Sequence, residues 1–179
     1  MRYAEWNRPI RKRFYEPRRK QLLPAAKAMQ RLEERKIHRL LLEMPPGVGK
    51  STLAIMFMIW TGMRNPELSV LGVSHNNAFL RGVYDEILRM LDPDGEYLWA
   101  EIFPESGISN TLAKDMRIDL VTNKRFQTYQ FSSIGSGNAG KVRATNLLYC
   151  DDLVDGIESA MSIDRMDKLW SLYNTAARQ

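Results

Sequence analysis

The sequence has few of the residues that form disulfides and metal centres. Cys150 is the single cysteine among 179 residues, so no disulfide can form within the chain. A single thiol is typical of proteins from a reducing compartment. The two histidines, His38 and His75, have no metal-ligand spacing with each other or with Cys150, which argues against a zinc site.

Long apolar runs are also absent. No run approaches the roughly 18 residues that a membrane-spanning helix needs, so we expect no membrane association. The N-terminus is basic but has no apolar stretch of the kind found in signal peptides. Hydrophobic residues make up 44% of the chain, which is ordinary for a globular protein of one domain.

Positive charge is concentrated at the N-terminus. The chain carries +5, and residues 1–20 carry +6, which leaves −1 for the rest. The basic side chains of this segment are Arg2, Arg8, Arg11, Lys12, Arg13, Arg18, Arg19 and Lys20. We interpret residues 1–20 as a basic arm and 21–179 as the domain. A solvated arm and an arm that contacts the phosphate backbone of DNA both remain open.

Strands and helices alternate along the domain. The patterns predict helices over 21–36, Lys50–Thr61, Asn76–Leu91 and Glu158–Ala177, and strands over Leu40–Glu43, Val70–Ser74, 117–121, 127–131 and Asn146–Cys150. The strands at 117–121 and 127–131 read as a hairpin or as two paired strands. This alternation predicts an α/β fold with a mainly parallel central sheet flanked by helices.

The stretch Met44-Pro45-Pro46-Gly47-Val48-Gly49-Lys50-Ser51 lies between a predicted strand and a predicted helix. That order is the context of a phosphate-binding P-loop, although Met44 stands where the general pattern has glycine. Glycines let backbone N–H groups approach an anion, and the start of the helix favours negative charge. The predicted nucleotide-binding residues here are Pro46, Gly47, Val48, Gly49, Lys50, Ser51 and Thr52.

Lys50 and Ser51 have defined roles in such a loop. The lysine reaches the β- and γ-phosphates, and the serine hydroxyl binds Mg²⁺. A second motif follows the apolar strand Leu147–Cys150, where Asp151 and Asp152 stand together. In a P-loop enzyme we expect Asp151 to bind the metal and Asp152 to act as the catalytic base, although an aspartate pair can also cap a strand end.

Arg143 and Gln21 are two further candidates. Arg143 follows a Gly-rich stretch, where a cation can stabilise charge on a transferred phosphoryl group as an arginine finger does. Lys141 competes for that role, and Arg143 can equally be a surface cation. The Gln21 amide can read the edge of adenine while an aromatic, here Phe14 seven residues earlier, stacks on the base, or it can be an ordinary helix-surface residue.

Several segments together resemble the ATPase domain of the large terminase subunit, the DNA-packaging motor of tailed bacteriophages. The similar segments are Leu42–Ser51, Val73–Ala78, the Gly-rich stretch with Arg143, Leu148–Asp152, and the segment with Ala160, Ser162 and Trp170. The resemblance covers about residues 15–179, and the two nucleotide motifs are its specific part.

The resemblance implies an additional-strand, RecA-like P-loop ATPase that uses ATP and Mg²⁺ to move double-stranded DNA into a procapsid. It implies Gln21 as the adenine reader and Arg143 as the residue that completes a neighbour's site in a homo-oligomeric ring. It also implies portal protein and small terminase subunit as partners, in the cytoplasm of an infected bacterium. Since the family's coupling motif and nuclease domain would follow Gln179, we expect an incomplete ATPase domain without nuclease activity.

Two other functions share these motifs. One is a superfamily-2-like helicase or another DNA-dependent ATPase, which also has a P-loop, adjacent acids and an upstream glutamine. The other is a binding or assembly module that holds nucleotide without turnover.

Overall fold

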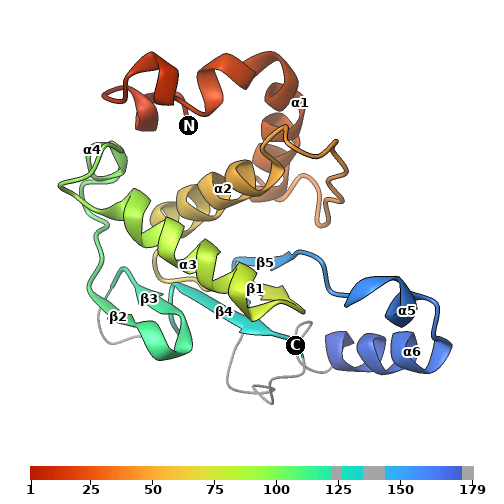
Figure 1. The fold of residues 1–179 in the computed structure, drawn as a ribbon. Helices are drawn as coiled ribbons and strands as arrows, with labels where there is room; N and C mark the ends of the chain where they lie inside the picture. The colour runs from red at the N-terminus through yellow and green to blue at the C-terminus, as the bar shows by residue number, and fades with distance from the viewer. Residues whose placement is uncertain (122–125, 135–143, 175–179) are drawn as a thin grey trace.

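The computed structural model describes the chain except for residues 122–125, 135–143 and 175–179 (Figure 1). Its α-helices and β-strands are, in chain order, α1 (Tyr15–Glu33), α2 (Lys50–Arg64), β1 (Val70–Ser74), α3 (Asn77–Leu91), α4 (Trp99–Ile102), β2 (Asn110–Leu112), β3 (Arg117–Asp119), β4 (Tyr129–Ser133), β5 (Leu147–Cys150), α5 (Gly156–Ala160) and α6 (Ile163–Leu172). Within the described residues, none of these helices has both the length and the apolar content that crossing a bilayer requires.

The five strands form one mixed sheet in the order β2-β3-β4-β1-β5. β1 pairs in parallel with β4 and β5, whereas β2 with β3 and β3 with β4 are antiparallel. The α/β class is therefore confirmed, and the prediction of a mainly parallel sheet is wrong. The four residues between β2 and β3 are too few for the crossover that a parallel pair needs, which takes a dozen residues or more.

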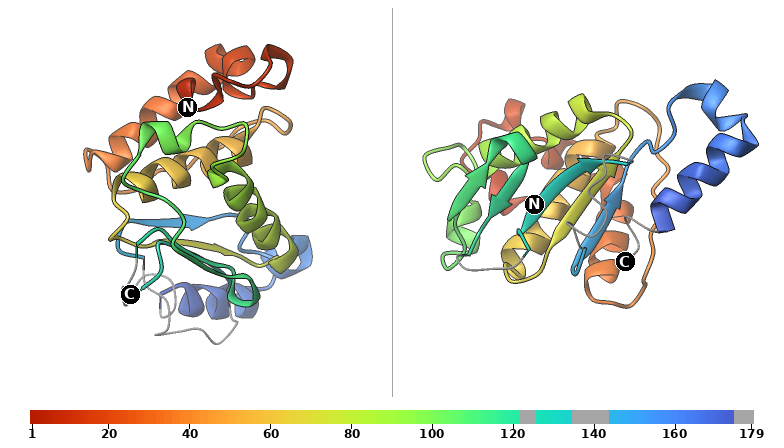
Figure 2. Two further views of the ribbon diagram at one scale, coloured as in Figure 1. Left: turned by 90° about the vertical axis from the view of Figure 1, so that its left-hand side faces the viewer. Right: turned by 90° about the horizontal axis from the view of Figure 1, so that it is seen from below.

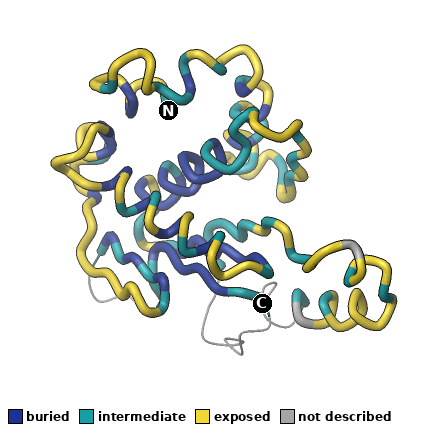
Figure 3. Tube along the Cα trace, in the orientation of Figure 1, coloured by how far each residue is buried: buried dark blue, intermediate teal, exposed yellow. Residues whose placement is uncertain are grey.

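The helix α2 lies at the centre of the packing. Every residue from Leu53 to Ile59 is buried, and the burial-coloured trace shows the same run (Figure 3). One side of α2 packs with α3 and the sheet, and the other side packs with α1 (Figures 1 and 2). A helix that is buried all round must be apolar all round, as this one is.

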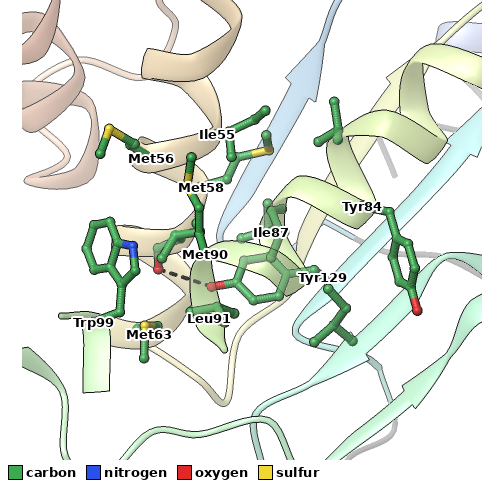
Figure 4. Close-up of a cluster of buried hydrophobic side chains, with 14 of the residues drawn as sticks. Ile55, Met56, Met58, Met63, Tyr84, Ile87, Met90, Leu91, Trp99 and Tyr129 are labelled. Carbon is green, nitrogen blue, oxygen red and sulfur yellow. Dashed lines mark hydrogen bonds between the residues drawn. The ribbon is translucent and has the colours of Figure 1, made fainter. Parts of the chain in front are cut away.

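The main core fills the space between α2, α3 and β4 (Figure 4). Tyr129 of β4 is fully buried there, and its hydroxyl donates to the carbonyl of Ile59 at 3.1 Å. The ring also packs against Gly62, where an added methyl carbon would lie 2.6 Å from Tyr129 Cε1. α2 therefore continues three residues past the predicted end at Thr61 because glycine permits this close approach.

The prediction of a strand at Leu40–Glu43 is wrong. The segment is extended, with Leu40 and Leu42 half-buried and Leu41 exposed, but it pairs with no strand among the described residues. Within that part of the chain, residues 38–48 make no backbone–backbone hydrogen bond. β5, the nearest candidate, lies across a hollow of about 840 Å³ that both segments line.

The helix α1 crosses the predicted boundary between residues 20 and 21. It begins at Tyr15 because the buried carboxylate of Glu5 accepts the backbone N–H groups of Phe14 and Tyr15, both at 2.8 Å. Such acceptors satisfy donors that the first turn of a helix leaves unpaired. Ala4 and Glu5 are both buried, so this part of the basic segment is packed into the fold.

Several cations of the basic segment contact other groups of the protein. Arg2 pairs with Glu16 at 2.8 Å, and Arg8 and Lys12 both pair with Glu96 at 3.1 Å. Among the described residues, three exposed cations of this segment have no such partner: Arg11, Arg19 and Lys20. These three are the cations that remain available for a phosphate backbone.

The C-terminal region forms two helices where the sequence predicts one over Glu158–Ala177. α5 ends at Ala160, and Ser162 then caps α6 by accepting the N–H of Arg165 at 3.4 Å. The last part of the predicted helix, 175–177, lies outside the described residues.

Candidate functional site

The loop before α2 has the backbone that an anion-binding turn requires. Gly47 and Gly49 have φ values of +80° and +96°, in the left-handed region that residues with a Cβ avoid. α2 begins at Lys50, as the sequence predicts. Because residues 38–48 form no backbone–backbone hydrogen bond within the described structure, their N–H groups are not committed to another backbone carbonyl.

An aromatic ring from the N-terminal segment lies against this loop. Phe14 contacts Gly49 so closely that an added methyl carbon there would lie 2.6 Å from Phe14 Cζ. The Arg18 guanidinium lies over the same ring, 5.2 Å from its centroid. The Phe14 ring is therefore already packed against the loop, with a cation over it.

The two aspartates of the second motif follow β5, at the sheet edge where β1 also ends. β1 and β5 are parallel, so their carboxyl ends lie side by side. The Asp151 amide donates to the carbonyl of Val73 at 3.1 Å, which extends the ladder by one residue. Asp152 then departs from the strand with a left-handed φ of +46°. The backbone therefore leaves the strand conformation directly after Asp151.

Lys50 and the aspartates converge at this edge. Lys50 Nζ lies 3.8 Å from Asp151 Oδ1, although these residues are about a hundred positions apart in the sequence. They share a hollow of about 460 Å³, which is lined by Lys50, Ser51, Ser74, Asn76, Phe79, Asp151 and Asp152. The larger hollow beside β5 also reaches Lys50, Asp151 and Asp152. These three polar residues therefore lie where the two hollows meet, and we call this place the junction.

The backbone of Asp152 is fixed by the end of β1. Its carbonyl oxygen accepts the His75 backbone N–H at 3.1 Å and lies 2.5 Å from His75 Nδ1, so that ring nitrogen is the donor. Ser74 Oγ donates to the same oxygen at 3.4 Å. The Asp152 side chain is 70% exposed and faces the smaller hollow. Its backbone is held while its carboxylate stays accessible.

Asp151 is held differently, through its side chain. The Tyr149 hydroxyl donates to Asp151 Oδ2 at 2.7 Å, and the carboxylate is 18% exposed. Burial, followed by this hydrogen bond, raises the pKa of Tyr149 well above its ordinary value. The phenol is therefore protonated at neutral pH and acts as the donor.

The other predicted site residues lie at varying distances from this junction. Pro46, Gly47, Val48 and Gly49 form the turn that leads into Lys50, and Thr52 follows in the first turn of α2. Gln21 is exposed on α1 and lines neither hollow. Arg143 lies outside the described residues, so its predicted role stays a prediction.

The donor set at the junction suits Mg²⁺ better than a metal held by protein ligands alone. Among the described residues, no three His, Cys, Asp or Glu side chains group closely enough to hold an ion. The smaller hollow is lined by two carboxylates, Asp151 and Asp152, and by the hydroxyl-bearing residues Ser51 and Ser74. Mg²⁺ sites commonly consist of one or two carboxylates completed by water and substrate phosphates. The residues present fit that arrangement.

Sequence reasoning missed His75 and Tyr149. For Tyr149 a signal was available, because residues two apart on a strand face the same side, which places its ring beside Asp151. For His75 there was none, since its contact depends on β1 and β5 being neighbours.

No family model matches the chain, and no curated protein matches its sequence.

Proposed function

We propose that this chain is a P-loop ATPase domain that binds ATP with Mg²⁺ and hydrolyses it. The observation that carries the proposal is the convergence of Lys50 and Asp151, with 3.8 Å between Nζ and Oδ1, in a hollow that Ser51 and Asp152 share. A loop with two left-handed glycines leads directly into the long helix whose first residues, Lys50 and Ser51, line this hollow. Together they offer cationic, backbone and carboxylate groups to one triphosphate.

Each residue has a separate task in this proposal. The loop N–H groups and Lys50 bind phosphate oxygens, so Lys50 must exchange Asp151 for the phosphates when nucleotide binds. Bound Mg²⁺ would supply positive charge that offsets the phosphate oxygens. Ser51 and Asp151 would hold that ion, and the exposed Asp152 carboxylate would accept a proton from the attacking water.

We further propose that ATP hydrolysis drives translocation of double-stranded DNA, as the resemblance to terminase large subunits suggests. The P-loop, the acid pair and the Ser74–Asn76 segment beside them support this reading. In the same reading the partners are a portal protein and a small terminase subunit, with copies of the chain in a ring in an infected bacterium. The exposed cations Arg11, Arg19 and Lys20 are the DNA contacts that we propose for the N-terminal segment.

Phosphate release from ATP tests the enzymatic proposal. Wild type should release phosphate only with Mg²⁺, and Lys50→Ala should abolish nucleotide binding because the main side-chain cation is lost. Asp152→Asn should retain binding but lose at least about a hundredfold in rate, as expected for a missing general base. Equal release by wild type and both variants would refute the assignment. Tight binding of ATP without release by wild type would support the alternative of a non-hydrolysing module.

A further inference from the structure

The strand geometry places Tyr149 and Asp151 on the same side of the sheet. Residues two apart in a strand point to the same face. Asp151 keeps this alternation because its amide still donates to the Val73 carbonyl, at 3.1 Å. The tyrosine side chain is long enough for its hydroxyl to reach the next carboxylate on that face, and the 2.7 Å hydrogen bond shows that it does.

The two oxygens of the Asp151 carboxylate have different partners. Oδ2 accepts the hydroxyl of Tyr149, and Oδ1 lies 3.8 Å from the ammonium group of Lys50. When Lys50 moves to phosphate, Oδ1 loses its cation while Oδ2 keeps its donor. The hydrogen bond from Tyr149 therefore determines which oxygen is presented to an incoming cation.

The tyrosine itself is held by packing. Its ring is half-buried and packs against both apolar clusters around α2. Side chains that orient a functional group are effective when their own rotamers are locked by such packing. Asp152 differs, because its carboxylate is 70% exposed and its hydrogen bonds with His75 are made through its backbone carbonyl, while Asp152 Oδ2 lies 3.7 Å from His75 Nδ1.

We infer that Tyr149 is a positioning residue for metal binding: it fixes the Asp151 carboxylate so that Oδ1 alone faces the cation of a bound Mg²⁺–nucleotide. The inference rests on the proposed nucleotide site and adds a residue to it. Tyr149 does not touch the nucleotide. Its hydrogen bond holds the Asp151 carboxylate in one orientation, so that the carboxylate does not have to reorient when the metal binds.

The test compares Tyr149→Phe with wild type by the binding of a fluorescent ATP analogue, first in EDTA and then at rising Mg²⁺. The variant should bind the analogue in EDTA as wild type does, because no phosphate contact changes. It should need about ten times more Mg²⁺ for half of the metal-dependent gain in affinity, the lower end of the effect of outer-shell partners.

Tyr129→Phe is the matched control. It also removes the hydroxyl of a tyrosine in the same sheet, but this hydroxyl donates to the Ile59 carbonyl of α2 in the core. Thermal unfolding should show a loss of stability for this control. In the binding titration, the control should need as much Mg²⁺ as wild type does. If Tyr149→Phe behaves as the control does, Tyr149 is merely structural and the inference is wrong. If wild type shows no Mg²⁺-dependent binding at all, the proposed nucleotide site fails and the inference fails with it.

Discussion

Gly49 meets two structural requirements at once, a left-handed backbone and close packing against a ring, and a comparison with Gly47 separates their energetic costs. Its φ of +96° lies in the left-handed region, and the Phe14 ring packs where a side chain would begin. Gly47 offers a matched comparison two residues earlier. Its φ is +80°, but nothing lies within 4 Å of the position that a Cβ would take. Gly47→Ala therefore reports backbone strain alone, and Gly49→Ala reports strain plus overpacking.

The expected magnitudes follow from these geometries. A left-handed φ costs a residue with a Cβ about 1–2 kcal/mol, and alanine recovers about 0.4–1 kcal/mol by restricting the unfolded chain. Gly47→Ala should therefore lower the free energy of unfolding by about 1 kcal/mol. At Gly49 the added methyl carbon would lie 2.6 Å from Phe14 Cζ, and overpacking adds about 1–3 kcal/mol. Because the ring is half-buried and can yield in part, we expect the lower half of that range.

Urea denaturation measures both variants, and the difference between them is the decisive quantity. Phe14→Leu shortens the side chain at the contact, so Gly49→Ala should cost less in that background, while Gly47→Ala should cost the same. Equal losses for the two glycine variants in the wild-type background would refute the reasoning. So would a Gly49→Ala loss that Phe14→Leu leaves unchanged, because the ring would then not be the obstacle.

Two further predictions concern the N-terminal segment. Glu5→Ala leaves two backbone donors at the start of α1 without their acceptor, and should lower the free energy of unfolding by about 2–3 kcal/mol; an unchanged urea midpoint would contradict this. Replacing Arg11, Arg19 and Lys20 by glutamine should reduce the slope of log affinity for duplex DNA against log salt by about 2.7. Lys12→Gln is the control, since Lys12 already pairs with Glu96, and a triple variant with the wild-type slope would remove these cations from the DNA contact.

Local patterns predicted the elements that carry the site. The apolar run Val70–Ser74 became β1 as expected, and α2 began at Lys50 because the Gly-Lys-Ser sequence favours a helix start there. The same reasoning failed at Leu40–Glu43. An apolar run indicates a buried strand, but strand formation also needs a neighbour to pair with, and the run itself contains no information on that.

Contacts distant in sequence account for the remaining errors. The start of α1 depends on Glu5, ten residues before Tyr15, so helix periodicity alone placed the start too late. β2 was missed because its three residues are all exposed and show no alternation. Its antiparallel pairing with β3 adds to that of β3 with β4, and both make the sheet mixed. The acid pair was found from its motif, but its unequal anchoring through Tyr149 and His75 depends on tertiary structure.

Among the described strands, β5 lies at an edge of the sheet, so its amides should open locally while those of the core open only with the whole domain. The amides of Leu147 and Asp151 donate toward β1, so the alternate amides of Leu148 and Cys150 point away from it, across the large hollow. Residues 38–48, on the other side of this hollow, also make no backbone–backbone hydrogen bond within the described structure. In deuterated water, β5 and residues 38–48 should exchange these amide hydrogens rapidly. The amides of α2, which lines the hollow between them, should exchange only when the whole domain opens. The most protected helix would then lie beside two segments whose amides exchange fast.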